Sequence, residues 1–143
     1  MNTRGIPRGI RNHNPGNVEY HIDGDEWDGM CEEQEDGRFL QFDEAVMGIR
    51  CIAKLLLNYQ ARSQCQSVKD IINRWAPPFE NDTTAYIEHV AALLEVEPED
   101  EIRLRTRDLD KLPILIKAII QHENGVQPYS NELIDEAIEK AIA

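Results

Sequence analysis

Apolar residues recur at three- and four-residue steps over most of the chain after Asp43, which is the spacing of one face of an α-helix. Polar stretches and Pro or Gly residues interrupt this pattern, so separate helices are expected between them. The expected helical ranges are 44–62, 67–75, 83–96, 110–124 and 131–143. The pattern therefore predicts a mostly helical structure.

Residues that commonly cap helices precede most of these segments, because their side chains accept hydrogen bonds from the first backbone amides. The candidate caps are Asp43, Ser67 with Asp70 three residues later, Asn81 or Asp82, and Ser130 or Asn131. Pro77–Pro78 and Gly125 are expected to end two of the helices. Gly48 lies inside the first helix at a cost of roughly 1 kcal/mol relative to Ala, so a close backbone contact is expected there.

The first 43 residues have a different pattern, rich in Gly, Asn, Asp and Pro. Short apolar alternations occur in "NVEY" and "RFLQF", and turn-forming residues gather in "DGDEWDG" and "EDG". We expect a loop-rich segment that carries a small β-hairpin. The fold class expected from the whole chain is mostly α (α+β), in one domain spanning residues 1–143 with a small N-terminal β-hairpin lobe.

The charge and composition of the chain disfavour several classes of function. The formal net charge is -12, which disfavours a nucleic-acid-binding role or adhesion to an anionic membrane. No apolar run approaches the ~20 residues of a membrane span, and the N-terminus has no apolar region typical of a secretory signal. We expect synthesis in the bacterial cytoplasm without a signal peptide. Cys31, Cys51 and Cys65 show no CxxC spacing, and "DGDEWDG" lacks the EF-hand order, so no metal or cofactor is expected.

The stretch "LPILIKAIIQHENG" is the most unusual in the chain. Only Lys117 is charged before the last turn, so the helix is expected to be central, yet it ends on Glu123. Partial burial and the negative end of the helix dipole both disfavour a charged carboxylate and raise its pKa, as a general acid requires. The alternative is an exposed Glu123 paired with His122 or a lysine.

Three polar clusters offer candidate binding groups. "RNHNPGN" places several Asn amides around a tight turn, and "RWAPPFENDTTAY" places aromatic rings beside carboxylate, amide and hydroxyl groups. Trp27 lies in the third cluster, "GDEWDG". The Asn cluster suits sugar hydroxyl and acetamido groups. The aromatic cluster is a reasonable sugar-binding surface, and the Trp27 ring offers a face that a ligand can stack on. Each cluster also has a structural alternative: a self-bonded Asn loop, a core Trp75 followed by helix caps, or a Trp27 folded over the core.

Four stretches resemble a family of small phage and prophage proteins often described as virion structural proteins. They are "RGIRNHNPGN", "FDEAVMGIRCIAKLLLNY", "RWAPPFENDTTAYIEHVA" and "AIIQHENGVQPYS". The resemblance covers almost the whole chain, and it implies a virion or prophage origin.

"AIIQHENG" also resembles the helix-end motif of lytic transglycosylases and related glucosaminidases, while "NPGN" and "FLQFDEAVMGI" resemble other blocks of that lysozyme-like group. The order of the blocks implies a circular permutation. This resemblance implies a lysozyme-like fold in which Glu123 is the catalytic acid, with Glu80, then Asp82, the best candidates for a second carboxylate. The residues implied to bind glycan are Asn14, Asn17, Trp27, Asn81, Thr83, Tyr86 and Tyr129.

The function implied is cleavage of peptidoglycan glycan strands, of the lytic transglycosylase or muramidase type. The partners would be glycan strands and other virion proteins, with no nucleic acid and no membrane. The protein would act in the periplasm or cell wall, or reside in a virion. The alternatives are a non-catalytic virion structural or glycan- or protein-binding protein, and a regulatory module for a basic partner.

Overall fold

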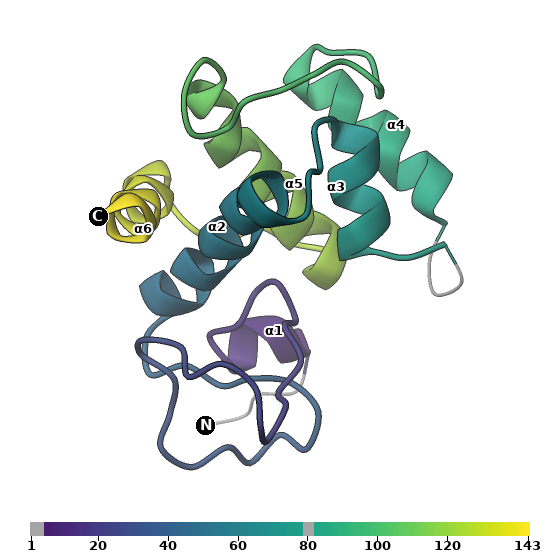
Figure 1. The fold of residues 1–143 in the computed structure, drawn as a ribbon. Helices are drawn as coiled ribbons and strands as arrows, with labels where there is room; N and C mark the ends of the chain where they lie inside the picture. Colours follow the sequence, from purple (N-terminus) through teal and green to yellow (C-terminus); the bar gives the residue numbers. More distant parts are fainter. Residues whose placement is uncertain (1–4, 79–81) are drawn as a thin grey trace. The chain divides into compact units, whose positions relative to one another are not determined.

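The structure is a computed structural model that describes residues 5–78 and 82–143. Its helices, in chain order, are α1 (Arg8–Arg11), α2 (Ala45–Arg62), α3 (Val68–Trp75), α4 (Thr83–Leu94), the 3₁₀ helix η1 (Leu109–Lys111), α5 (Leu112–Asn124) and α6 (Asn131–Ile142) (Figure 1). The prediction of a mostly helical protein is confirmed. In addition, the short helix α1 lies in the segment that was expected to contain only loops and a hairpin.

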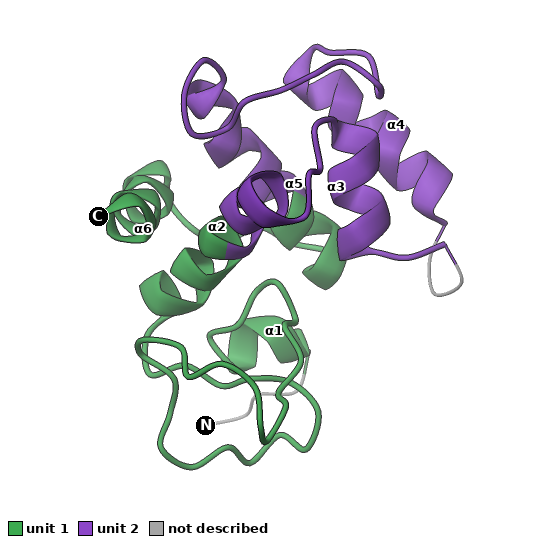
Figure 2. Ribbon diagram, in the orientation of Figure 1, with its two compact units in different colours: residues 1–54, 119–143 green, residues 55–118 purple. Residues whose placement is uncertain are grey.

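The chain forms two compact units. Unit 1 contains Met1–Lys54 and Ile119–Ala143, and unit 2 contains Leu55–Ala118 (Figure 2). The boundaries between the units fall inside α2 and α5, so each of these helices contributes residues to both units.

The prediction of an N-terminal β-hairpin is wrong. Within the residues that the structure describes, the segments 17–20 and 38–42 contain no strand. The chain pairs there only at two isolated antiparallel bridges, Glu19 with Phe39 and Met30 with Phe42. The alternating pattern places the two segments together, as Leu40 N–H donates to the Val18 carbonyl at 2.9 Å, but no ladder extends from these contacts.

Side-chain amides occupy the backbone groups that a β-ladder would use. Gln34 Nε2 donates to the carbonyls of Cys31 and Gln41 at 2.8 and 2.9 Å, and Gln41 N–H donates to Gln34 Oε1 at 2.8 Å. Gln41 Oε1 in turn accepts from the backbone N–H of Glu35 at 2.7 Å. Because buried backbone groups need one partner each, these side chains replace strand pairing in unit 1.

Asp36 is a second organising centre of this segment. Its carboxylate accepts hydrogen bonds from Arg8 Nη2 at 2.6 Å, Asn12 Nδ2 at 2.9 Å and the backbone N–H of Phe39 at 2.9 Å. Hydrogen bonds from Arg8 are the main reason that the pKa of Asp36 lies well below its ordinary value. The guanidinium groups of Arg8 and Arg38 also lie over the Phe39 ring, 4.8 and 4.7 Å from its centroid. These contacts attach α1 to the loop that follows it.

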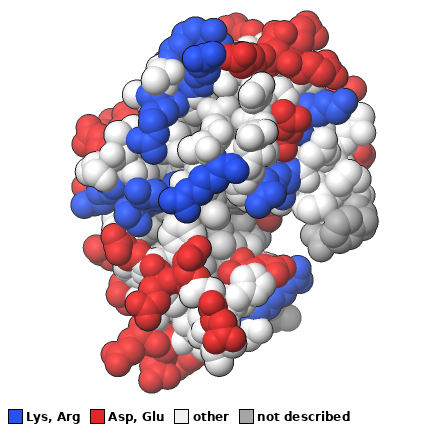
Figure 3. Space-filling view, in the orientation of Figure 1, with Lys and Arg blue, Asp and Glu red and all other residues white. Residues whose placement is uncertain are grey.

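Most of the net charge belongs to one stretch of unit 1. Residues 19–44 contain eleven Asp and Glu residues and one Arg. Figure 3 shows acidic side chains gathered over the N-terminal part of unit 1 on the face drawn, whereas unit 2 carries both basic and acidic side chains there. The charge of -12 is therefore unevenly distributed along the chain.

Helix caps in unit 2 follow the sequence pattern. Ser67 Oγ accepts from the backbone N–H of Asp70 at 3.2 Å, and Asp70 Oδ2 accepts from the N–H of Gln66 at 3.0 Å. Asp82 Oδ1 accepts from the N–H of Ala85 at 3.3 Å. These contacts satisfy backbone donors that a helix start leaves without partners, and they confirm the caps expected at Ser67 and Asp82.

The core of unit 2 is built from the apolar faces of its helices. α3 packs against α4. The buried side chains of these two helices are Val68, Ile71, Ile72, Tyr86, Ile87, Val90, Ala91 and Leu94. At the edge of this core, the rings of Tyr59 and Trp75 meet edge to face with centroids 6.3 Å apart, and Trp75 is half-buried.

In unit 1 the end of α5 and one face of α6 are buried, with Ile119, Ile120 and Ile134 fully inaccessible. Ser130 caps α6 by accepting from the N–H of Leu133 at 3.1 Å. The expectation of a central helix ending near Glu123 agrees with the burial of both Ile119 and Ile120.

The close contact expected at Gly48 is confirmed. A Cβ at this position would collide with the backbone carbonyl oxygen of His13, and it would lie 3.2 Å from Pro15 Cδ. α2 therefore requires glycine where it meets the "NPGN" turn. His13 itself has a positive φ of 52°, and its ring Nδ1 lies 3.2 Å from the Phe42 carbonyl.

Cys31, Cys51 and Cys65 are free thiols. Burial raises the pKa of all three, most strongly that of Cys51. Among the described residues no cluster of His, Cys, Asp or Glu is suited to a metal ion. The described helices also include none with the length and apolar character needed to span a membrane.

Candidate functional site

The last turn of α5 places Glu123 at the edge of the unit 1 core. The helix ends at Asn124 because Gly125 adopts a φ of +76° and its N–H bonds the Gln121 carbonyl at 2.8 Å. Gln121 Nε2 then donates to the Gly125 carbonyl at 2.7 Å. Glu123 is half-buried, whereas the neighbouring His122 is exposed. The carboxylate therefore lies at the negative end of a largely buried helix.

Asn17, from the "NPGN" turn, reaches this helix end. Its Nδ2 lies 3.4 Å from both Glu123 Oε1 and the Glu123 backbone carbonyl. These distances are at the long end of the hydrogen-bonding range, so each contact is weak by itself. Asn17 has a φ of 49°, in the left-handed region that Asn tolerates better than most residues. The turn thus presents an amide to the carboxylate.

Asn124 fastens the same turn to the helix. Its Nδ2 donates to the Pro15 carbonyl at 2.8 Å and to the Ile120 carbonyl at 3.0 Å. The first of these bonds joins residues 109 positions apart in the chain. Since Asn124 follows Glu123 directly, this bond ties the "NPGN" turn to the residue beside the carboxylate.

Gly9 of α1 completes the contact. A Cβ at Gly9 would lie 2.5 Å from Asn124 Oδ1, 2.8 Å from Asn17 Oδ1 and 2.9 Å from the Asn14 carbonyl. The two amide oxygens are buried and have no hydrogen-bond partner in the described structure. They face the Cα of Gly9, where only a weak C–H···O contact is available. This packing keeps the NH₂ groups of both amides turned away from Gly9, towards Glu123 and Pro15.

Asn14 has a structural role in the same turn. Its side chain is fully buried. Nδ2 donates to the carbonyls of Val18 and Leu40 at 3.0 and 2.9 Å, and Oδ1 accepts from the Val18 N–H at 3.1 Å. Both amide hydrogens are occupied, as the self-bonded loop alternative predicts. Of Asn14 and Asn17, Asn17 is the one that lies near the carboxylate.

Trp27 and Tyr129 also belong to unit 1, and both are half-buried. Trp27 begins a tight turn in which its carbonyl accepts from the Met30 N–H at 3.1 Å. The side chain of Gln127 bonds the backbone of Tyr129 on both sides. Its Nε2 donates to the Tyr129 carbonyl, and its Oε1 accepts from the Tyr129 N–H. The Tyr129 hydroxyl is buried without a hydrogen-bond partner among the described residues, and burial raises its pKa.

The remaining candidates belong to unit 2 or fall outside the described residues. Thr83 is buried, and its hydroxyl donates to the Ala76 carbonyl at 2.6 Å. Tyr86 lies in the buried face of α4. Glu80 and Asn81 lie outside the described residues.

The sequence patterns missed two residues of this arrangement, Gly9 and Asn124. Gly9 precedes "IRNHNPGN" and had no local reason to be singled out. Asn124 stands beside Glu123 and was interpreted only as part of the stop signal before Gly125. Its position directly after the candidate acid at a helix end is the signal that could have identified it.

The arrangement brings a carboxylate and an amide donor together. The half-buried carboxylate lies at the C-terminal end of α5. The Asn17 amide lies close enough to donate to it.

Comparison with known proteins finds a phage relative. The chain is 37% identical over 133 residues to Protein P5 of Pseudoalteromonas phage PM2, and the match covers 92% of this chain and 80% of the relative. No protein-family model matches the chain.

Proposed function

We propose that this chain, which belongs to the family of Protein P5 of Pseudoalteromonas phage PM2, is a phage-derived protein that cleaves the glycan strands of peptidoglycan. Glu123 acts as the general acid and then as the general base. The class of reaction is that of a lytic transglycosylase or a muramidase.

The observation that carries this proposal is the contact between Asn17 Nδ2 and Glu123 Oε1. It joins two stretches, "RNHNPGN" and "AIIQHENG", that are more than one hundred residues apart in the chain and that separately resemble parts of glycan-cleaving enzymes. Gly9 and Asn124 reinforce the same junction. A Glu with only a structural role at a helix end does not require Gly9, Asn17 and Asn124 to meet beside it.

In the proposed mechanism, Glu123 protonates the oxygen of the β-1,4 bond as the bond to the muramic acid carbon breaks. The resulting carboxylate then takes a proton from the nucleophile, and the Asn17 amide stabilises the ionised form by donating to Oε1. In a hydrolase the nucleophile is water. In a transglycosylase it is the 6-hydroxyl of the same sugar, which produces a 1,6-anhydro end.

The transglycosylase route is favoured because it operates with one carboxylate, whereas most hydrolases use two. Glu80 is the proposed second carboxylate for the hydrolytic route. The substrate-binding set, which extends beyond Asn17 to Trp27 and Tyr129, is part of the same proposal.

We further propose that the protein reaches peptidoglycan as part of a phage particle or on release at lysis. A phage particle delivers enzymes to the cell wall without a secretory signal, and family membership is consistent with this route. Other virion proteins are then its partners.

The test is digestion of purified sacculi followed by mass spectrometry of the soluble muropeptides. Wild-type protein is expected to release 1,6-anhydro-muropeptides, and Glu123→Gln is expected to reduce release by at least about a hundredfold, the lower end of a general acid–base contribution. Glu136→Gln is a matched control, since Glu136 is an exposed Glu on α6; it should release muropeptides at the wild-type rate.

Reducing ends in place of anhydro ends would assign hydrolysis and require a second carboxylate. Equal release by wild type and Glu123→Gln would refute the role of Glu123. If folded wild-type protein releases nothing from intact sacculi, the proposal that it cleaves peptidoglycan is refuted. That result would support the alternative, a non-catalytic virion structural or binding protein.

A further inference from the structure

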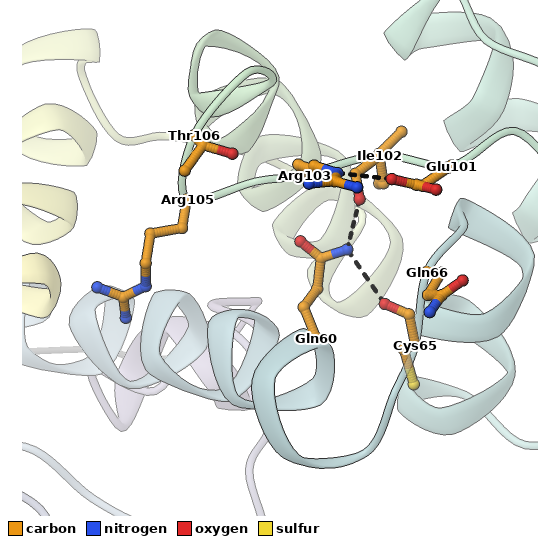
Figure 4. A pocket seen from close by; sticks show the side chains of 8 residues that line it. All are labelled: Gln60, Cys65, Gln66, Glu101, Ile102, Arg103, Arg105 and Thr106. Atoms are coloured by element: carbon orange, nitrogen blue, oxygen red, sulfur yellow. Dashed lines mark hydrogen bonds and ion pairs between the residues drawn. The ribbon is translucent and has the colours of Figure 1, made fainter.

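Unit 2 contains a pocket that is separate from the residues of the proposed active site. It has a volume of about 300 Å³, close to the lower limit for small-molecule sites. Its lining comes from the end of α2, the segment that leads into α3, and residues 101–106. Figure 4 shows these side chains from close by.

Gln60 forms a rigid base for the pocket. Its Nε2 donates to the carbonyls of Cys65 and Ile102 at 3.1 and 2.8 Å, and its Oε1 accepts from the Leu104 N–H at 2.8 Å. The Ile102 N–H also donates to the Gln66 carbonyl at 2.8 Å. Gln60 is therefore fully used in joining the two walls, and ligand contacts must come from other side chains.

The pattern "IRLRT" places two arginines at the pocket. Ile102 and Leu104 are buried, and the alternation turns Arg103 and Arg105 outward. Arg103 Nε donates to Glu101 Oε1 at 2.6 Å, and this hydrogen bond is the main reason that the pKa of Glu101 is lowered. The one carboxylate of the lining is thus already neutralised by Arg103.

Arg105 is different because the described residues provide it with no ion pair. In Figure 4 it extends away from the Arg103–Glu101 pair, at the other end of the lining. The lining residues carry two arginines and one glutamate, so the pocket has an excess positive charge in a chain of net charge -12. The Gln66 amide and the Thr106 hydroxyl are neutral donors in the same lining. Figure 4 draws Gln66 at the end opposite to Arg105.

We propose that this pocket binds a small organic anion through a carboxylate or phosphate group held by Arg105. A guanidinium forms two parallel hydrogen bonds with either group. The volume of the pocket suits a ligand the size of a small metabolite or a single side group of a larger molecule.

The test is an NMR titration of ¹⁵N-labelled protein with inorganic phosphate and, separately, with glutarate, at constant ionic strength. Backbone amide shifts at residue 66 and residues 101–106 are expected to saturate. Arg105→Gln should raise Kd by about tenfold, the loss that follows removal of one charge-assisted hydrogen bond. Arg11→Gln is the matched control, because Arg11 is an exposed arginine of unit 1, and it should leave Kd unchanged.

The two probes distinguish the sources of the anion. Saturation by glutarate alone assigns a carboxylate ligand, and saturation by phosphate alone assigns a phosphorylated one. Shifts that sodium chloride reproduces, an equal loss in Arg105→Gln and Arg11→Gln, or no saturable shift with either probe would overturn the proposal.

Discussion

The N-terminal segment of unit 1 and the helical core of unit 2 satisfy their backbone hydrogen-bonding groups in different ways. In unit 2, backbone groups pair within helices, and apolar faces such as those of α3 and α4 bury one another. In residues 5–44, a single four-residue helix forms in the described structure, and side chains of Asn14, Gln34 and Gln41 satisfy the backbone instead.

The difference shows where a sequence pattern carries structural information. Helix periodicity depends on many positions, so one substitution rarely hides it. A polar network depends on a few side chains, each with a specific set of partners. The first kind of region should lose stability through cavities, and the second through unpaired buried groups. Three changes test this distinction, in order of the expected effect.

The largest effect is expected in the unit 2 core. Ile72→Ala removes a fully buried side chain from α3 and should lower the free energy of unfolding by about 3 kcal/mol, because it loses apolar contact and leaves a cavity. Urea unfolding followed by circular dichroism measures this loss. Leu93→Ala, at a side chain that is 44% exposed on α4, should cost far less. Equal losses would contradict a core-based account of unit 2.

A somewhat smaller effect is expected from the polar network. Asn14→Ala leaves the Val18 N–H and the Leu40 carbonyl without their side-chain partner and should cost about 2 kcal/mol, the penalty of unpaired buried groups. Asn73→Ala, at a half-buried Asn of α3, is the control and should be nearly neutral. Hydrogen exchange should show faster opening of residues 12–42 in Asn14→Ala. A neutral Asn14→Ala would show that the network is not needed.

The smallest change in stability is expected when the pH is lowered and Asp36 becomes protonated. Because the pKa of Asp36 is lower in the folded protein than its unfolded value near 4, its contribution to stability is complete above about pH 4. It is lost as the pH falls from there through the folded value. Asp36→Asn should therefore be less stable than wild type at pH 6 and should lose less stability between pH 4 and pH 2.5. Urea titrations at these pH values measure the difference, and parallel curves for both proteins would contradict it.

Much of the helical architecture was predictable from local patterns. The apolar spacing identified α2 to α6, and the caps at Ser67, Asp82 and Ser130 were each expected from one or two neighbouring residues. Gly48 was expected to mark a close backbone contact, since glycine inside a helix otherwise costs stability.

The N-terminal segment was not predictable in the same way. Alternation in "NVEY" and "RFLQF" placed the two segments together correctly but suggested strands. Whether a backbone N–H pairs with another strand or with an amide such as that of Gln34 depends on residues distant in space, which periodicity does not report. The same limit concealed the use of both Asn14 amide hydrogens inside the turn.

By itself, the sequence determined the helical class, the ends of most helices, the acidic character of the chain and the choice of Glu123 as the candidate acid. These features depend on residues close together in the chain, where spacing and composition suffice. Tertiary structure alone decided that Gly9, Asn17 and Asn124 meet beside Glu123. Those contacts join positions more than one hundred residues apart, and only the packing of the folded chain brings such groups within hydrogen-bonding distance.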